Sequence, residues 1–118
     1  MSKSEIFQEP IPVETIQRLA DEEFGNMVKF VVDLERRVIC AGGGLHSDEE
    51  ELLLQDGSKQ SDLWGANFYL DRPKEKRLIY TSMINIRPSD GNVKQEIMSN
   101  EIRQRVKELA DYFLQTFP

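Results

Sequence analysis

Residues 28–41 read VKFVVDLERRVICA, and this stretch decides the fold class. Apolar residues at every second position from Val28 to Leu34 predict a strand with one face toward a core, because successive strand side chains point to opposite faces. A second apolar run, VICA, begins after only three charged residues, 35–37. So short a connection predicts that the two strands pair as an antiparallel hairpin.

A helix is predicted on each side of this hairpin. Before it, Pro12 suits the first turn of a helix. The apolar stripe that follows has helical spacing and consists of Val13, Ile16, Leu19, Ala20 and Phe24. After the hairpin, Ser47 and Glu50 form a capping-box pattern ahead of three leucines, 52–54. Because this second helix is only about two to three turns long, it must dock on the sheet to be stable.

The C-terminal half repeats the pattern of two strands and a helix. Alternation from Trp64 to Leu70 predicts a third strand, and residues 78–87 predict a longer fourth strand. Ser99 or Asn100 can cap a last helix. Its apolar stripe consists of Ile102, Val106, Leu109, Phe113 and Phe117.

The predicted order of elements is therefore α-β-β-α-β-β-α. Two hairpins and three amphipathic helices predict an α+β domain, with an antiparallel sheet of about four strands and the helices mainly on one face. We expect residues 1–9 to be a flexible lead-in and residues 10–118 to form a single domain.

Composition limits the class of protein. A chain of 118 residues that is 39% hydrophobic and 31% charged is a globular domain. Its net charge of −6 disfavours nucleic acid and anionic membranes as partners, and no apolar run is long enough to span a bilayer. The only cysteine, Cys40, lies in an apolar run and is interpreted as a core residue, because a reactive thiol needs a cationic neighbour. These features favour a reducing, cytoplasmic setting.

Residues 42–65 hold a triple glycine and the only histidine. Gly42–Gly44 before a helix start is an anion-binding arrangement in principle, but the acidic residues that follow would repel phosphate. A bulge at the end of a strand explains the glycines as well. With one histidine and one cysteine, we expect no metal and no cofactor. His46 either bonds a neighbouring carboxylate or carbonyl group, or serves as a general acid–base.

A second polar cluster surrounds the end of the predicted fourth strand. Pairing of the last two strands would bring it beside the loop before Trp64, so that segments 42–65 and 86–92 form two walls of a site. Arg87 either holds a carboxylate or phosphate group, or pairs with an aspartate (Asp56, Asp62 or Asp90) and braces the two loops while asparagines satisfy turn backbone. The predicted binding residues are Gln60, Asn67, Asn85, Arg87, Ser89 and Asn92.

Two segments, LHSDEEELLLQDGSKQSDLWGAN (residues 45–67) and INIRPSDGN (residues 84–92), are distinctive as they stand. They resemble a family of short prokaryotic proteins known only as a domain of unknown function. The resemblance extends from about Pro10 to the last helix. It implies a small stand-alone domain and transfers no catalytic residue.

The function itself is not determined by these patterns, and two classes stay open. The first is a small cytoplasmic binding or interaction protein that self-associates through an exposed sheet edge, with an unknown small-molecule ligand. The second is a small enzyme acting on an anionic metabolite or phosphoester, with Arg87 as the anion holder and His46 or Asp62 as the acid–base. The net charge disfavours a third class, a nucleic-acid or toxin–antitoxin regulator.

Overall fold

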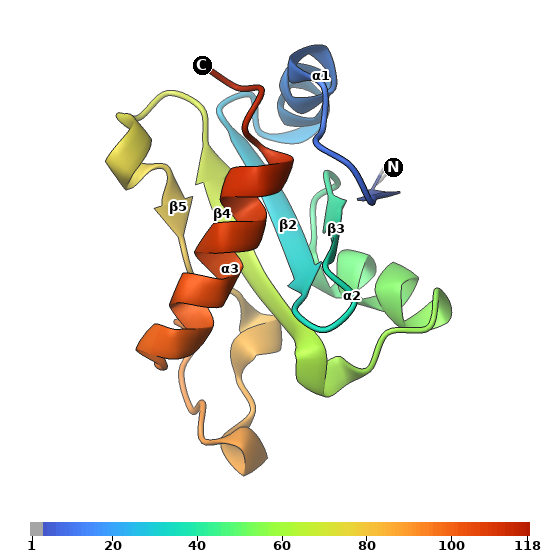
Figure 1. Ribbon diagram of the computed structural model, residues 1–118, viewed down its shortest axis with the longest axis vertical. Coiled ribbons are helices and arrows are strands. Elements are labelled where there is room, and N and C mark those ends of the chain that lie inside the picture. The colour runs from blue at the N-terminus through green and yellow to red at the C-terminus, as the bar shows by residue number, and fades with distance from the viewer. Residues whose placement is uncertain (1–3) are drawn as a thin grey trace.

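The computed structural model describes residues 4–118, and an antiparallel sheet forms its centre (Figure 1). The strands, in the spatial order β1-β3-β2-β4-β5, are β1 Glu5–Phe7, β2 Met27–Asp33, β3 Val38–Ala41, β4 Leu63–Tyr69 and β5 Leu78–Ile79. The helices are α1 Val13–Glu23, α2 His46–Gln55 and α3 Asn100–Phe113. The α+β class and the antiparallel sheet are thus confirmed, with five strands in place of about four.

The predicted hairpin lies at the middle of this sheet. β2 pairs with β3 on one side and, along its whole length, with β4 on the other. The turn is shaped by Asp33, whose Oδ1 accepts hydrogen bonds from the N–H groups of Glu35 at 2.9 Å and Arg36 at 2.8 Å. Arg37 then adopts a left-handed conformation with φ 57°, which reverses the chain into β3.

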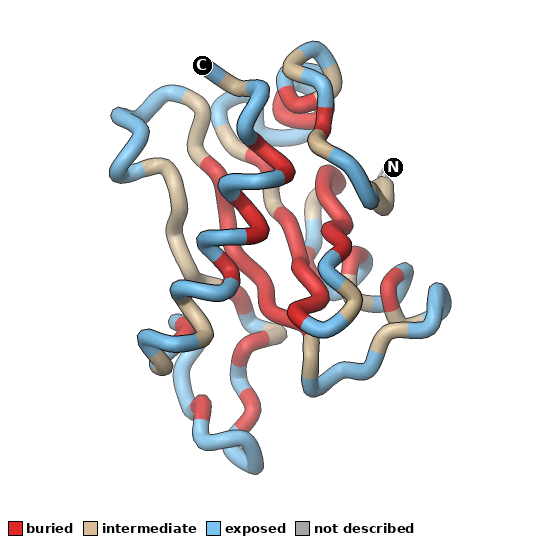
Figure 2. Tube along the Cα trace, in the orientation of Figure 1, coloured by how far each residue is buried: buried red, intermediate tan, exposed pale blue. Residues whose placement is uncertain are grey.

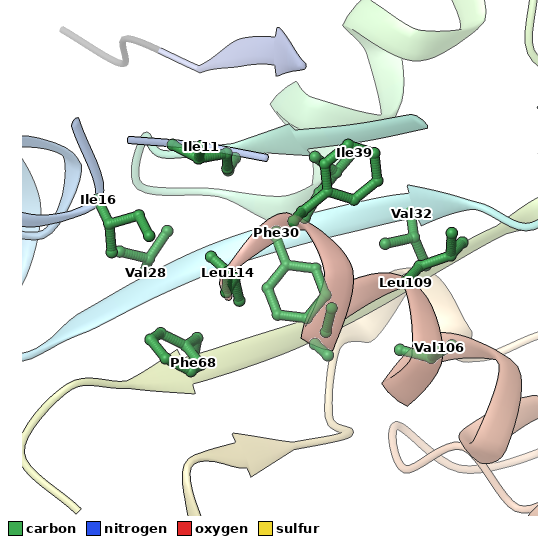
Figure 3. Close-up of a cluster of buried hydrophobic side chains, with 14 of the residues drawn as sticks. Ile11, Ile16, Val28, Phe30, Val32, Ile39, Phe68, Val106, Leu109 and Leu114 are labelled. Carbon is green, nitrogen blue, oxygen red and sulfur yellow. The ribbon is translucent and has the colours of Figure 1, made fainter. Parts of the chain in front are cut away.

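The larger core lies between one face of the sheet and the helices α1 and α3 (Figures 1 and 3). Phe30 is fully buried at its centre, and Ile39 lies on the same face of the neighbouring strand. Leu109 of α3 and Leu114, the residue directly after α3, also belong to this core, and Ile16 contributes from α1. The alternation in the sequence therefore marks the face of the sheet that two of the three helices share.

α2 packs on the opposite face of the sheet, where the intervening strand residues point. Its partners form a separate, smaller cluster that consists of Val31, Val38, Cys40, Leu53 and Leu63. Two helices on one face and one on the other agree with the expectation that the helices lie mainly on one face.

The expectation of a flexible lead-in over residues 1–9 is wrong for residues 5–7, because they form β1 and pair with β3. Ile6 pairs with Cys40 and packs against the smaller cluster, so apolar burial adds to the backbone pairing. Ser4 Oγ also donates to the Gly42 carbonyl at 3.0 Å. Residues 1–3 lie outside the described residues.

The predicted fourth strand over residues 78–87 is also wrong in extent. β5 ends at Ile79, and the chain continues through two 3-10 turns, Met83–Asn85 and Pro88–Asp90. Ser82 Oγ accepts a hydrogen bond from the Ile84 N–H group, and such local bonding competes with sheet pairing. Proline cannot donate to a strand ladder, which makes a continuation beyond Arg87 unfavourable.

The helix caps follow the sequence at α3 but not at α2. Ser99 caps α3, its Oγ accepting a hydrogen bond from the Ile102 N–H group at 3.2 Å. α2 begins at His46 with Leu45 as its N-cap, so Ser47 lies inside the first turn and caps nothing. The capping-box interpretation of Ser47 and Glu50 is therefore wrong. At the start of α2, His46 is buried against the sheet, with its Nε2 2.7 Å from the Ala66 carbonyl.

The two ends of the domain are joined by hydrogen bonds. The Ile11 N–H group donates to the Phe113 carbonyl at 2.8 Å, and Thr116 Oγ1 donates to the Ile11 carbonyl at 2.6 Å. The segment entering α1 and the segment leaving α3 therefore lie side by side, as Figure 1 shows near the label C.

Replacing the two serines tests the cap assignment. We expect Ser99→Ala to lower the free energy of unfolding by about 1 kcal/mol, because one N–H group of α3 loses its acceptor. Ser47→Ala, the matched control, should leave stability within about 0.5 kcal/mol of the wild type. Urea unfolding followed by circular dichroism measures both values. A larger loss for Ser47→Ala than for Ser99→Ala would contradict the assignment.

Candidate functional site

The two segments predicted to form the walls of a site meet directly at Arg87. Its guanidinium donates hydrogen bonds to the carbonyl groups of Gln60 and Leu63, the latter at 2.6 Å. The same group lies 4.0 Å from the centroid of the Trp64 ring, a cation–π contact. Asp90 adds a distant ion pair at 3.9 Å. Arg87 thus braces the two loops, mainly through backbone carbonyls rather than through the aspartates that the sequence suggests.

Asn85 occupies the edge of β4 beyond the end of β5. Its Oδ1 accepts a hydrogen bond from the Gly65 N–H group at 2.9 Å, and its Nδ2 donates to the Gly65 carbonyl at 3.0 Å. Nδ2 also donates to the Gln95 carbonyl at 3.0 Å. One side-chain amide therefore pairs with Gly65 as a strand residue would. Gly65 has no room for a side chain, since an added Cβ would lie 2.8 Å from Ser82.

Asn92 holds the segment between β5 and α3, residues 82–98, which we name the braced loop. Its Nδ2 lies within hydrogen-bond distance of three carbonyl oxygens, those of Asn85, Lys94 and Glu96. Its Oδ1 accepts from the Met98 N–H group at 2.8 Å. At the base of the loop, the Ile97 N–H group donates to the Tyr80 carbonyl at 3.0 Å. The loop is thereby closed on itself.

The other predicted site residues do not form one site with these three, although the Gln60 carbonyl is an acceptor of Arg87. Asn67 Nδ2 donates to the Thr81 carbonyl at 3.1 Å, which ties β4 to the chain after β5. Ser89 is exposed at the tip of the braced loop. The Gln60 side chain lies near Glu50, whose carboxyl pKa is raised by burial and lowered to a smaller extent by this neighbour. The Asp62 carbonyl accepts a hydrogen bond from the Leu34 N–H group at 3.0 Å. The structure therefore brings Asn85, Arg87 and Asn92 together as a scaffold.

The outward side of the braced loop carries apolar residues that sequence reasoning missed. Arg87 and Asn92 are buried and form an antiparallel bridge, which places their neighbours Ile86 and Val93 opposite each other. Both are exposed, Val93 to 59%, and Met83 is exposed to 73%. Figure 2 shows the buried positions as short red segments within an otherwise exposed loop. In the sequence, Ile86 and Val93 each stand next to a polar residue that is buried, and this alternation could have indicated that the two apolar side chains face outward.

His46 is not placed to work with Arg87. Its Nε2 lies 2.7 Å from the Ala66 carbonyl and must be the donor there, because a carbonyl oxygen only accepts. Burial lowers the pKa of His46 to about 4, so the ring is neutral at pH 7. Ala66 and the Arg87 acceptor Leu63 are three residues apart on β4, roughly 10 Å. The geometry gives no support to an enzyme that combines these two side chains.

Glu49 is a second residue that sequence reasoning missed. It is fully buried between α2 and the sheet, and within residues 4–118 neither carboxyl oxygen has a hydrogen-bond partner. Burial raises the pKa of Glu49 well above its usual value, while the charge of Lys29 on β2 opposes the shift. Burial also raises the pKa of the Cys40 thiol on β3, with Glu49 adding to the effect. Cys40 is thus an unreactive core residue.

Metal binding is not supported in the part of the chain that the structure describes. No group of three histidine, cysteine, aspartate or glutamate side chains lies together there in a way that could hold an ion.

Fold and side-chain arrangement define a small α+β domain whose buried polar side chains mostly hydrogen-bond its own backbone. The chain belongs to the family described as Protein of unknown function (DUF5674), which matches residues 5–113. This confirms the resemblance to an uncharacterised family. Neither the search of curated proteins nor the search of solved structures gave a match.

Replacing Asn85 tests the scaffold. Asn85→Ala removes the partners of the buried N–H and carbonyl groups of Gly65, so we expect a loss of about 2–4 kcal/mol in the free energy of unfolding. Hydrogen exchange should show faster exchange of the Gly65 amide. Ser89→Ala, which changes an exposed residue of the same loop, should leave both measurements unchanged. Equal effects of the two variants would show that Asn85 is not the brace.

Replacing Glu49 gives a pH-dependent prediction. Because the folded-state pKa of Glu49 is raised, the unfolded chain releases this proton first, and the wild type loses stability as pH rises from 4.5 toward the folded-state pKa. Glu49→Gln carries no titratable group there. Its gain in free energy of unfolding over the wild type should therefore grow with pH, measured by urea unfolding across a pH series. Glu51→Gln, an exposed change on α2, should keep the wild-type profile; a Glu49→Gln gain independent of pH would refute the prediction.

Proposed function

We propose that this protein is a small binding protein that self-associates through the outward side of the braced loop. The observation that carries the proposal is the exposure of apolar side chains on a backbone held by buried polar groups. Met83, Ile86, Val93 and Met98 are all exposed within residues 82–98. Exposed apolar residues gathered in one segment are typical of interaction surfaces.

The bracing of the loop supports a binding role. Asn85, Arg87 and Asn92 are each at least nine-tenths buried, and their hydrogen bonds fix the backbone from which the apolar side chains project. A loop that is ordered before binding loses little conformational freedom when a partner arrives. This order therefore favours association.

Charge favours a second copy of the chain as the partner. The whole chain has a net charge of −6, which opposes association of copies on most surfaces. The braced loop holds two basic residues, Arg87 and Lys94, and two acidic residues, Asp90 and Glu96, so its net charge is zero. In a two-fold dimer the same surface meets itself, and the exposed Lys94 of one copy can approach Asp90 or Glu96 of the other.

The sheet edges are less suited to this role than the sequence suggests. The outermost strands are β1, with three residues, and β5, with two. Short edge strands offer few unpaired backbone groups to another chain. We therefore place the interface on the braced loop rather than on a sheet edge.

The cellular setting is part of the proposal. Cys40 is a buried free thiol, which suits the reducing conditions of a cytoplasm. We also propose that the family consists of short prokaryotic proteins. We propose further that the sequence segments 45–67 and 84–92 are characteristic of the family. Separately, no helix within residues 4–118 is long and apolar enough to cross a membrane.

Sedimentation velocity over a concentration series tests self-association. We expect a monomer–dimer equilibrium for the wild type. The double variant Met83→Ser with Val93→Ser should weaken the dimer at least about tenfold, because each truncated anchor contributes about 1–2 kcal/mol.

Leu45→Ser provides the matched control, since Leu45 is exposed to 58% but lies outside the braced loop. It should associate as the wild type does. A wild type that remains monomeric throughout the series, or a control that weakens the dimer as much as the double variant, would contradict the proposal.

A further inference from the structure

A groove of about 550 Å³ is lined by residues of the β4–β5 hairpin and of the C-terminal part of α3. This volume falls within the usual range of small-molecule sites. Phe68, Leu78 and Phe117 provide apolar walls, and Arg77 and Tyr80 also line the groove. None of these residues belongs to the braced loop, so the groove is independent of the proposed self-association.

Two aromatic rings hold the Arg77 side chain in this groove. Phe68 and Phe117 pack edge to face, with ring centroids 5.7 Å apart. The Arg77 guanidinium lies 5.0 Å from the Phe117 centroid and 5.9 Å from the Phe68 centroid. Its Nε donates to the Arg72 carbonyl at 2.9 Å, the one hydrogen bond of this side chain among the described residues. The two terminal nitrogens thus remain as a donor fork of the geometry that carboxylates match.

The charge of the groove is opposite to that of the chain. Three cationic residues line it, Lys74, Arg77 and Lys107, against two acidic residues, Glu75 and Asp111. Lys107 and Asp111 pair with each other at 2.6 Å. Lys74 is exposed and forms no ion pair with the described residues. A local positive excess on a chain of net charge −6 favours an anionic ligand at this place.

Tyr80 supplies a second donor. Its side chain is half-buried, and within residues 4–118 its hydroxyl group has no hydrogen-bond partner. Burial raises the pKa of Tyr80, which keeps the hydroxyl protonated and able to donate.

We propose that the groove binds a small carboxylate that carries an apolar body. The carboxylate is received by the terminal nitrogens of Arg77, with the Tyr80 hydroxyl as an additional donor. The apolar body lies against Phe68 and Phe117. The inference follows from a cleft with apolar walls in which Arg77 and Tyr80 present free donors and three cationic residues face two acidic ones.

Titration of three chemically matched probes tests this inference. Octanoate, octanol and octylamine each have a chain of eight carbon atoms and differ in the charge of the head group, which is negative, neutral and positive, respectively. In two-dimensional NMR spectra, we expect octanoate to shift the amide resonances of β5, of Phe68 and of the end of α3. Octanol should bind more weakly at the same place, and octylamine should not shift these resonances.

Two arginine variants separate the site from general surface charge. Arg77→Gln should weaken octanoate binding about fivefold or more and leave octanol binding unchanged, because only the charged contact is lost. Arg72→Gln, on the same hairpin but stacked on Tyr69 at 3.7 Å, should bind octanoate as the wild type does. Phe117→Ala should weaken both octanoate and octanol.

The inference is overturned if octanoate leaves the groove resonances unshifted, or if octylamine shifts them equally. It is also overturned if Arg72→Gln weakens binding as much as Arg77→Gln. Unchanged spectra away from the substituted residue confirm that each variant is folded.

Discussion

The side-chain amide of Asn85 occupies the position on β4 where a longer β5 would have paired. Without it, the buried N–H and carbonyl groups of Gly65 would have no partner on that side. Because a side chain supplies this pairing, the backbone after Ile79 is free to leave the sheet. That departure creates the braced loop, and it lets Arg87 reach back to the carbonyls of Gln60 and Leu63, where β4 begins. The loop, its exposed apolar residues and the brace around Trp64 therefore all depend on one amide.

The sequence predicted those parts of the fold that local periodicity determines. Residues 28–41 show a clear two-residue period and form the centre of the sheet, and α3 has both its stripe and its Ser99 cap. The extent of β5 could not be predicted, because residues 78–86 keep a two-residue apolar period outside the strand. The strand ends early because the Asn85 side chain pairs with the backbone of Gly65, which is 20 residues away in the sequence. The site residues were predicted as a cluster, but whether Arg87 faces a ligand or a carbonyl depends on tertiary contacts.

The buried stripe of α2 consists of His46, Glu49 and Leu53, at spacings of three and four residues. Only Leu53 is apolar, whereas α3 buries Val106, Leu109 and Phe113 against the other face. A buried carboxyl group without a partner costs free energy that apolar contacts must offset. The helical spacing of His46, Glu49 and Leu53 could have indicated that Glu49 is buried, but the run of four acidic residues, 48–51, makes this position hard to recognise.

The joined ends of the domain have a consequence for its synthesis. Ile11 bonds both Phe113 and Thr116, and α3 covers the apolar face around Phe30. The hairpin and β4 precede α3 in the chain, so this face is synthesised before the helix that covers it. The domain can therefore close only when translation has passed residue 116, and until then the nascent chain presents its largest apolar surface to chaperones.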